Sequence, residues 1–106
     1  MMEKPNISYI NQLAREDKNI KAELIAVIKL EFPEEKKNYY QSIEKKDFRK
    51  IEANVHKLKH KISILGLERG YEIANEFEHN LRELDLDRKE DFEEILSAIS
   101  DYIETI

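Results

Sequence analysis

Apolar side chains between residues 48 and 65 recur at alternating intervals of three and four, the spacing that lines one face of an α-helix. Comparable spacing precedes and follows this stretch. The 106 residues include two prolines and two glycines, too few to punctuate the many short strands of a β architecture. The pattern therefore predicts an all-α chain without strands. The apolar positions of the central stretch are Phe48, Ile51, Val55, Leu58, Ile62 and Leu65.

The first part of the chain predicts two helices. A short one covers about 7–14 with Asn6 as its N-cap, and a longer one follows an N-cap at Asp17. Pro33 lies inside the longer helix, where a proline removes one backbone hydrogen bond and crowds the preceding turn. The apolar face recovers its phase beyond Pro33, which favours a kink over a break. The apolar positions of this helix are Ile20, Leu24, Ile28, Phe32, Tyr39 and Ile43.

The rest of the chain predicts three more helices. One begins after an N-cap at Asp47 and ends near Leu65, with Gly66 beyond its C-terminus. The next covers about 68–84 and the last about 90–106. Because short connections favour antiparallel neighbours, the predicted fold is an antiparallel up-down four-helix bundle with a short extra N-terminal helix. The expected core positions of the last two helices are Ile73, Ala74, Phe77, Leu81, Leu84, Phe92, Ile95, Leu96, Ile99, Ile103 and Ile106.

Length and composition limit the possible functions. We expect a single domain over 1–106, with an N-terminal cap segment at 1–16 and the helical bundle at 17–106. The formal net charge of −5 disfavours nucleic-acid binding. No apolar run approaches the ~20 residues of a membrane span, and the N-terminus is too polar for a secretory signal. The absence of cysteine excludes disulfides and thiolate sites. We expect a cytoplasmic protein, and the start at Met1 favours a free-standing one.

His56 is the candidate reactive residue. It follows Val55 of the apolar stripe and therefore lies roughly 100° around the helix, beside the core face rather than on it. A neutral imidazole is a nucleophile near physiological pH. Lys57, Lys59 and Lys61 form a basic cluster that suits an anionic group or an acidic partner surface, although a charge run is usually a solvated helix face.

The residues around His56 also follow a known order. A leucine stands two residues after the histidine, a lysine three residues after it and a glycine ten residues after it. In this order and in its helix layout, the chain resembles a histidine-containing phosphotransfer (HPt) domain of two-component phosphorelays. The likeness extends from about Leu24 to the C-terminus. The matching residues are His56, Leu58, Lys59, Gly66 and the pair Phe77-Glu78.

The resemblance implies that His56 carries a phosphoryl group between aspartates of receiver domains. It implies a phosphocarrier of bacterial two-component signalling rather than a stand-alone enzyme, with Leu58 and Gly66 as structural residues. The expected partners are receiver domains of response regulators or of hybrid sensor kinases. The chain would need no cofactor or metal of its own, because Mg²⁺ belongs to the partner receiver domain. We expect a monomer.

Several residues near His56 have predicted roles. Lys59 lies one turn further along the helix and can offset the charge of a transferring phosphoryl group. Glu52, one turn back, is a candidate acceptor for the second ring nitrogen of His56. The edge of the docking surface is expected on the second helix, among Tyr40, Gln41 and Ser42. The residues expected to bind the partner are Lys57, His60 and Ser63.

His60 stands where HPt domains usually have a glycine on the same helix face. This departure keeps a second function open, a non-phosphorylated helical adaptor that binds a receiver-like partner through the same face. His56 and His60 also have the i, i+4 spacing of two metal ligands on a helix. The intervening lysines and the lack of a third ligand nearby disfavour a metal site.

Overall fold

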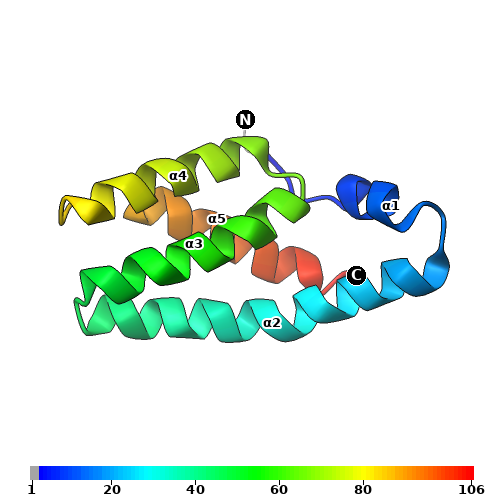
Figure 1. Ribbon diagram of the computed structural model, residues 1–106, viewed down its shortest axis with the longest axis horizontal. Helices are drawn as coiled ribbons and strands as arrows, with labels where there is room; N and C mark the ends of the chain where they lie inside the picture. Colours follow the sequence, from blue (N-terminus) through cyan, green and yellow to red (C-terminus); the bar gives the residue numbers. More distant parts are fainter. Residues whose placement is uncertain (1–2) are drawn as a thin grey trace.

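Five α-helices and no strand are formed by residues 3–106, the part of the chain that this computed structural model describes (Figure 1). Met1, on which the prediction of a free-standing protein was based, and Met2 lie outside the described residues. The all-α prediction is confirmed. The helices are α1 (Ser8–Ala14), α2 (Lys18–Glu44), α3 (Phe48–Ile64), α4 (Glu68–Arg82) and α5 (Lys89–Ile103).

The four helices from α2 to α5 run alternately in opposite directions (Figure 1). Helix α3 packs between α2 and α4, and α5 completes the bundle by contacting α4 and α2. Helix α1 packs against α2 at the end of the molecule where α3 ends (Figure 1). The predicted up-down four-helix bundle with a short N-terminal helix is therefore confirmed.

An aromatic cluster joins three of the helices in the core. The ring centroid of Phe92 on α5 lies 5.2 Å from that of Tyr39 on α2 and 5.3 Å from that of Phe77 on α4. All three side chains are fully buried. The Tyr39 hydroxyl donates a hydrogen bond to Oε2 of Glu93 at 2.9 Å, which satisfies the polar end of this buried ring. The cluster ties α4 to α2 and α5, and so supports the helix that faces the candidate site.

Helix α3, which carries His56, and its neighbour α2 both begin at the expected caps. Oδ1 of Asp17 accepts hydrogen bonds from the backbone N–H groups of Asn19 and Ile20, at 2.9 and 3.2 Å. Oδ1 of Asp47 accepts one from Lys50 at 3.3 Å. Each aspartate satisfies N–H groups that have no partner within the first helical turn. Both cap predictions are confirmed.

The N-terminal segment is attached to the turn between α3 and α4. Asn6 is not the N-cap residue of α1, which begins one residue later than predicted. Its Oδ1 accepts a hydrogen bond from the Ser8 N–H at 3.1 Å, while its own N–H donates to the C-cap carbonyl of α3 at 2.8 Å. The Glu3 carboxylate accepts from the N–H groups of Arg69 and Gly70, both at 3.0 Å. Glu3 therefore caps the N-terminus of α4 from a distant part of the chain.

Helix α2 passes through Pro33 without a break. The buried residues Phe32 and Tyr39 lie on either side of the proline and face the same core. The continuity of this apolar face is what the sequence predicted. Pro33 itself is exposed, so the hydrogen bond that it cannot donate is missing on the solvent side of the helix.

Some predicted core positions and helix ends are wrong. Leu84 was expected to be buried at the end of the fourth helix, but α4 ends at Arg82 and Leu84 is 70% exposed. Leu84 has a φ of 61°, so the chain turns towards α5 and the side chain points away from the core. Helix α5 stops at Ile103 rather than at residue 106, and Ile20 is exposed. The predicted core residues that are only partly buried are Leu24, Ile43, Phe48, Ile73, Ile95 and Ile106.

Candidate functional site

His56 lies on the exposed side of α3. Its neighbours Val55 and Leu58 are fully buried, which fixes the rotation of α3 and leaves 54% of the His56 side chain exposed. Its position beside the apolar stripe is as predicted. Nδ1 of His56 is 2.8 Å from Oε1 of Glu78 on α4. Because a carboxylate accepts hydrogen bonds, we assign the ring proton to Nδ1, which leaves the lone pair of Nε2 available to another molecule.

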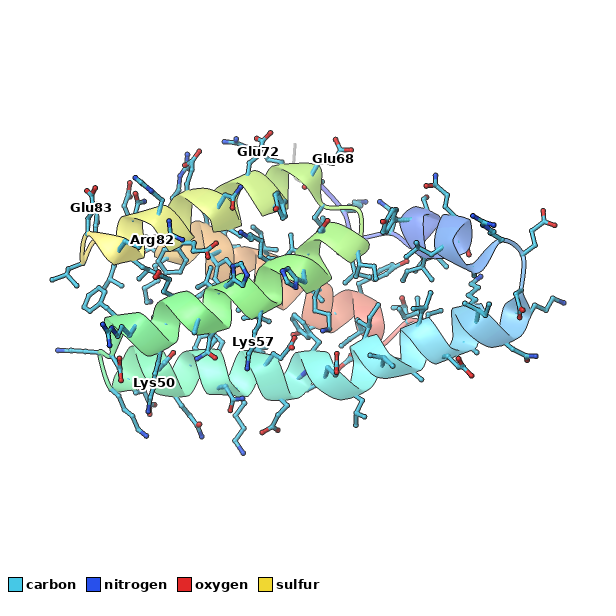
Figure 2. The ribbon with its side chains drawn as sticks, in the orientation of Figure 1. Lys50, Lys57, Glu68, Glu72, Arg82 and Glu83 are labelled. Carbon is cyan, nitrogen blue, oxygen red and sulfur yellow. The ribbon has the colours of Figure 1, made fainter. Side chains whose placement is uncertain are left out.

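The residue that orients His56 is Glu78, and the prediction of Glu52 is wrong. Glu52 instead accepts a hydrogen bond from Nε of Arg82 at 3.1 Å. Figure 2 shows Arg82 on the side of α4 that faces α3. The contact with Glu78 depends on the packing of α4 against α3, whereas Glu52 was chosen from spacing within one helix. The pair Phe77-Glu78 was the sequence signal that pointed to this residue, through the resemblance.

Glu78 holds a buried lysine with its other oxygen. Oε2 accepts a hydrogen bond from Nζ of Lys59 at 2.8 Å, and the two residues are only 6% and 8% exposed. Burial alone would raise the pKa of Glu78, but the hydrogen bonds from Lys59 and His56 outweigh burial and hold the pKa below its usual value. Glu78 is therefore a buried carboxylate that is ionised at neutral pH.

Lys59 is turned towards Glu78 rather than towards solvent. Its Nζ also donates to Oδ1 of Asn75 at 2.8 Å and lies 5.4 Å from the centroid of the Tyr71 ring. Both partners come from α4, so the ammonium group is fully engaged between the two helices. Lys59 therefore acts on His56 indirectly. Glu78 accepts hydrogen bonds from both residues, which form one chain from Lys59 to Glu78 to the imidazole.

The three predicted basic residues do not form one exposed cluster. Nζ of Lys61 is 2.9 Å from Glu31 and 3.3 Å from Glu35, both on α2. Burial alone would lower the pKa of Lys61, but these two carboxylates outweigh it and raise the pKa. Lys57 is exposed and makes no ion pair within residues 3–106 (Figure 2). Of the three, Lys57 is thus the one left to present its charge to solvent.

His60 lies beside His56 on the same exposed face. The centroids of the two rings are 5.1 Å apart and their planes are inclined by 65°. This contact follows from the i, i+4 spacing, which places side chains one turn apart on a helix. The exposed face around His56 therefore carries a second imidazole.

The comparison with protein families decides what kind of chain this is. The family model of the Hpt domain matches residues 23–106, which include α3, α4, α5 and most of α2. The chain belongs to the Hpt family. No curated protein and no solved structure matches it. Hpt domains transfer phosphoryl groups through a histidine in phosphorelays, act as phosphocarriers rather than catalysts and interact with receiver domains.

The structure also shows the surroundings of three other predicted residues of this Hpt domain, Leu58, Ser63 and Gly66. Leu58 is fully buried in the core, and Ser63 is exposed near the end of α3. Gly66 follows α3 with a φ of +77°, a conformation that favours glycine. A Cβ there would lie 2.6 Å from Nδ2 of Asn6, so the N-terminal segment also requires a glycine at this position.

The predicted edge of the docking surface on α2 needs correction. Ser42 is 3% exposed, and its hydroxyl donates to the carbonyl of Tyr39 at 2.6 Å while accepting from Asn54. Tyr40 faces the other neighbour of α2, where it borders a hollow together with residues of α5. Gln41 is exposed and borders a hollow shared with α3. Of the three predicted residues, Gln41 is therefore the one that is exposed at the edge of α2 beside α3.

Residues 3–106 contain no helix that combines the length and the apolar character needed to cross a membrane. The same part of this Hpt domain holds no group of three or more histidine or carboxylate residues arranged to bind a metal ion. His56 and His60 would thus be two ligands without a third.

Proposed function

We propose that this Hpt domain is a phosphorelay intermediate in which Nε2 of His56 carries a phosphoryl group between aspartates of receiver domains. The observation that supports this proposal is the 2.8 Å contact between Nδ1 of His56 and the buried Glu78. It holds an exposed imidazole in one orientation, with the unprotonated nitrogen on the opposite edge of the ring.

The proposed step is a displacement at phosphorus. The Nε2 lone pair forms a bond to the phosphorus atom of a phosphoaspartate, the P–O bond breaks, and the aspartate carboxylate leaves with its electron pair. The Nδ1 proton stays on the ring, which becomes positively charged, and the carboxylate of Glu78 stabilises that charge. The reverse step returns the group to the same aspartate or passes it to another receiver domain.

Lys59 supports this step through Glu78. Its ammonium group keeps Glu78 ionised and in place, rather than contacting the phosphoryl group itself. The Mg²⁺ of the reaction and the aspartate belong to the partner receiver domain, so the active site is complete only in the complex. The chain contributes the nucleophile and holds it in position, as expected for a phosphocarrier.

The docking surface is the exposed face of α3 around His56. It includes Lys57, His60 and Ser63, together with Gln41 at the edge of α2. Replacing His60 with glycine removes the side chain next to His56 without touching the core. We expect this variant to change the affinity for a receiver domain while the fold stays intact, at a cost of about 1 kcal/mol for a glycine inside a helix. Unchanged affinity and transfer rate would show that His60 takes no part in docking.

The proposal places the protein in a bacterial two-component pathway in the cytoplasm, as a monomer. Its partners would be receiver domains of response regulators or of hybrid sensor kinases. A one-to-one complex with a receiver domain, measured by light scattering, would support this stoichiometry. A stable dimer of the chain that buries His56 would contradict it.

The direct test is phosphoryl transfer from a panel of phosphorylated receiver domains, read by intact mass at neutral pH. The parent chain is compared with His56→Gln and with the matched control His79→Gln, which changes an exposed histidine of α4. We expect one acid-labile phosphoryl group in the parent and in the control, and none in His56→Gln. A phosphoryl group that persists in His56→Gln would refute the assignment of the acceptor.

A second candidate function is an adaptor that binds a receiver-like partner without being phosphorylated. The observation that favours it is the His60 ring, whose centroid lies 5.1 Å from that of His56 on the face that a partner would approach. The adaptor predicts binding that survives His56→Gln and no phosphoryl label from any donor. A panel that labels a control HPt domain but not this chain would favour the adaptor.

A further inference from the structure

His60 is an unengaged titratable group whose ring lies beside that of His56. It is exposed, its ring centroid is 5.1 Å from that of His56, and it makes no hydrogen bond within residues 3–106. The other two histidines differ from it, because His56 is held by Glu78 and His79 lies on α4. His60 is thus free to rotate towards a group attached to its neighbour.

A phosphoryl group on Nε2 of His56 would extend beyond the ring on this same face. Phosphoryl groups carry about −1.5 to −2 charges at neutral pH and three strong acceptor oxygens. An imidazole becomes a double donor when it is protonated, and its unperturbed pKa of about 6.5 means that protonation is accessible near neutral pH. The new negative charge favours protonation of a neighbouring imidazole.

The other charged groups around the two histidines are already paired. On α3, Lys59 is bound to Glu78 and Lys61 to two carboxylates of α2, Glu31 and Glu35. On α4, the two charged groups that face α3 are Glu78 itself and Arg82, which binds Glu52 and lies 3.7 Å from Glu78. Lys57 is the exception beside His56, since it is exposed and makes no ion pair within residues 3–106; Arg49 and Lys50, nearer the start of α3, are exposed in the same way.

Resting on the proposed function, we infer that His60 is a positioning residue that binds the phosphoryl group of phosphorylated His56. The protonated His60 ring donates a hydrogen bond to a phosphoryl oxygen, and this contact favours the phosphorylated state of His56 over phosphoaspartate. A neutral ring can donate this hydrogen bond too, but protonation adds a positive charge to the donor, so the contact strengthens as pH falls from about 8 towards 6. The relay would thereby hold its phosphoryl group more firmly at lower pH.

The test uses the full chain phosphorylated with phosphoramidate, a small-molecule donor. The P–N bond of the reagent breaks, a bond from phosphorus to Nε2 of His56 forms, and ammonia leaves. The ³¹P resonance is then followed from about pH 6 to about pH 8.5 in the parent, His60→Gln and His79→Gln. His60→Gln keeps a polar side chain but cannot gain a charge, and His79→Gln is the matched loss of a histidine outside the site.

We expect the ³¹P titration curves of the parent and of His79→Gln to coincide and to differ from that of His60→Gln, in which the phosphoryl group titrates without a neighbouring positive charge. The same variants are equilibrated with a receiver domain that accepts the phosphoryl group. At about pH 6 the ratio of phosphohistidine to phosphoaspartate should be about two- to fivefold lower in His60→Gln than in the parent, as expected for an exposed ion pair. At about pH 8 the two ratios should converge.

The inference and the proposed function fail in different ways. If His56 is phosphorylated but the ³¹P titrations and the equilibrium ratios of the parent and His60→Gln coincide, the inference is refuted and the relay role stands. If phosphorylated receiver domains place the phosphoryl group on His60, or on no histidine, both are refuted. An effect of His60→Gln that is independent of pH would show a steric role for His60 and would also refute the inference.

Discussion

Glu78 is the residue whose replacement tests most of this reasoning at once. Its two oxygens bind different donors, His56 Nδ1 and Lys59 Nζ, each at 2.8 Å. Glu78→Gln keeps the size of the side chain but offers a single acceptor oxygen, so one donor loses its partner. The substitution also removes the negative charge that balances the ammonium group of Lys59, a residue that is only 8% exposed.

The expected loss of stability follows from that unbalanced charge. Removing one partner of a buried ion pair costs about 3–5 kcal/mol, because the other charge stays buried without compensation. Lys59 keeps its hydrogen bond to Asn75, and its long side chain can move towards water, so the lower end applies. We expect a loss of about 3 kcal/mol in the free energy of unfolding, or about 12 °C in Tm for a domain of this size.

The expected kinetic effect comes from the second hydrogen bond. Without a carboxylate acceptor, the His56 ring is no longer held in one orientation with its proton on Nδ1. A hydrogen bond to a charged group is worth about 1.5–3 kcal/mol, which corresponds to a phosphoryl transfer that is about 10- to 100-fold slower. The rate is measured on folded protein at low temperature, so that the stability loss does not contribute.

Urea unfolding followed by circular dichroism gives the stability change. Glu83→Gln, which removes an exposed carboxylate just beyond α4, is the matched control and should change stability by less than about 0.5 kcal/mol (Figure 2). The double variant Lys59→Met/Glu78→Gln should recover most of the loss, because no unpaired charge remains. A loss below about 1 kcal/mol, or a double variant no better than Glu78→Gln, would refute the account of a compensated buried pair.

Further predictions concern pH and the N-terminal segment. Because the pKa of Glu78 is lowered by folding, its contribution to stability is complete above the unfolded value of about 4.3 and is lost as pH falls through the lowered value. Acid titrations of urea midpoints should show this loss in the parent and not in Glu78→Gln. Glu3→Gln should cost about 1 kcal/mol through its weaker cap on α4, with Lys4→Gln as the control in the same urea assay. Gly66→Ala should cost roughly 1–2 kcal/mol, seen as a lower Tm, because of its positive φ and the nearby Asn6 side chain; an unchanged Tm would contradict the strain.

The helices could be predicted because their signals are local. The spacing of apolar residues identifies the face of α3 that packs in the core, and Asp17 and Asp47 mark helix starts through bonds to residues two or three positions away. The same reasoning carried α2 through Pro33. It failed at Leu84, which continues the apolar spacing of α4 but lies beyond the end of the helix. Periodicity describes a face and does not by itself say where the chain turns.

The N-terminal cap of α4 shows the opposite case. Glu3 binds N–H groups 66 and 67 residues away, and nothing in the sequence near either end indicates this pairing. A helix N-terminus without its own capping side chain can be satisfied by any acceptor that the fold brings near. For that reason the first residues of the chain were predicted only as part of an N-terminal cap segment. Their specific contact with α4 was not predicted.

The exposed position of His56 beside the core face was predicted, but the electrostatics around it was not. The sequence shows three lysines around His56, and read locally they make a basic surface. In the fold, carboxylates from α2 neutralise Lys61 and Glu78 of α4 neutralises Lys59, which leaves Lys57 exposed. As a result, the charge in contact with His56 is the buried carboxylate of Glu78, and not an exposed cluster of lysines. A buried carboxylate, itself held by a buried lysine, sets the proton on Nδ1, and this acts through a low-dielectric interior that solvent ions screen weakly. The reactivity of the imidazole therefore depends on the contact between α3 and α4, and a substitution that loosens this contact should impair phosphoryl transfer even when it leaves the exposed face unchanged.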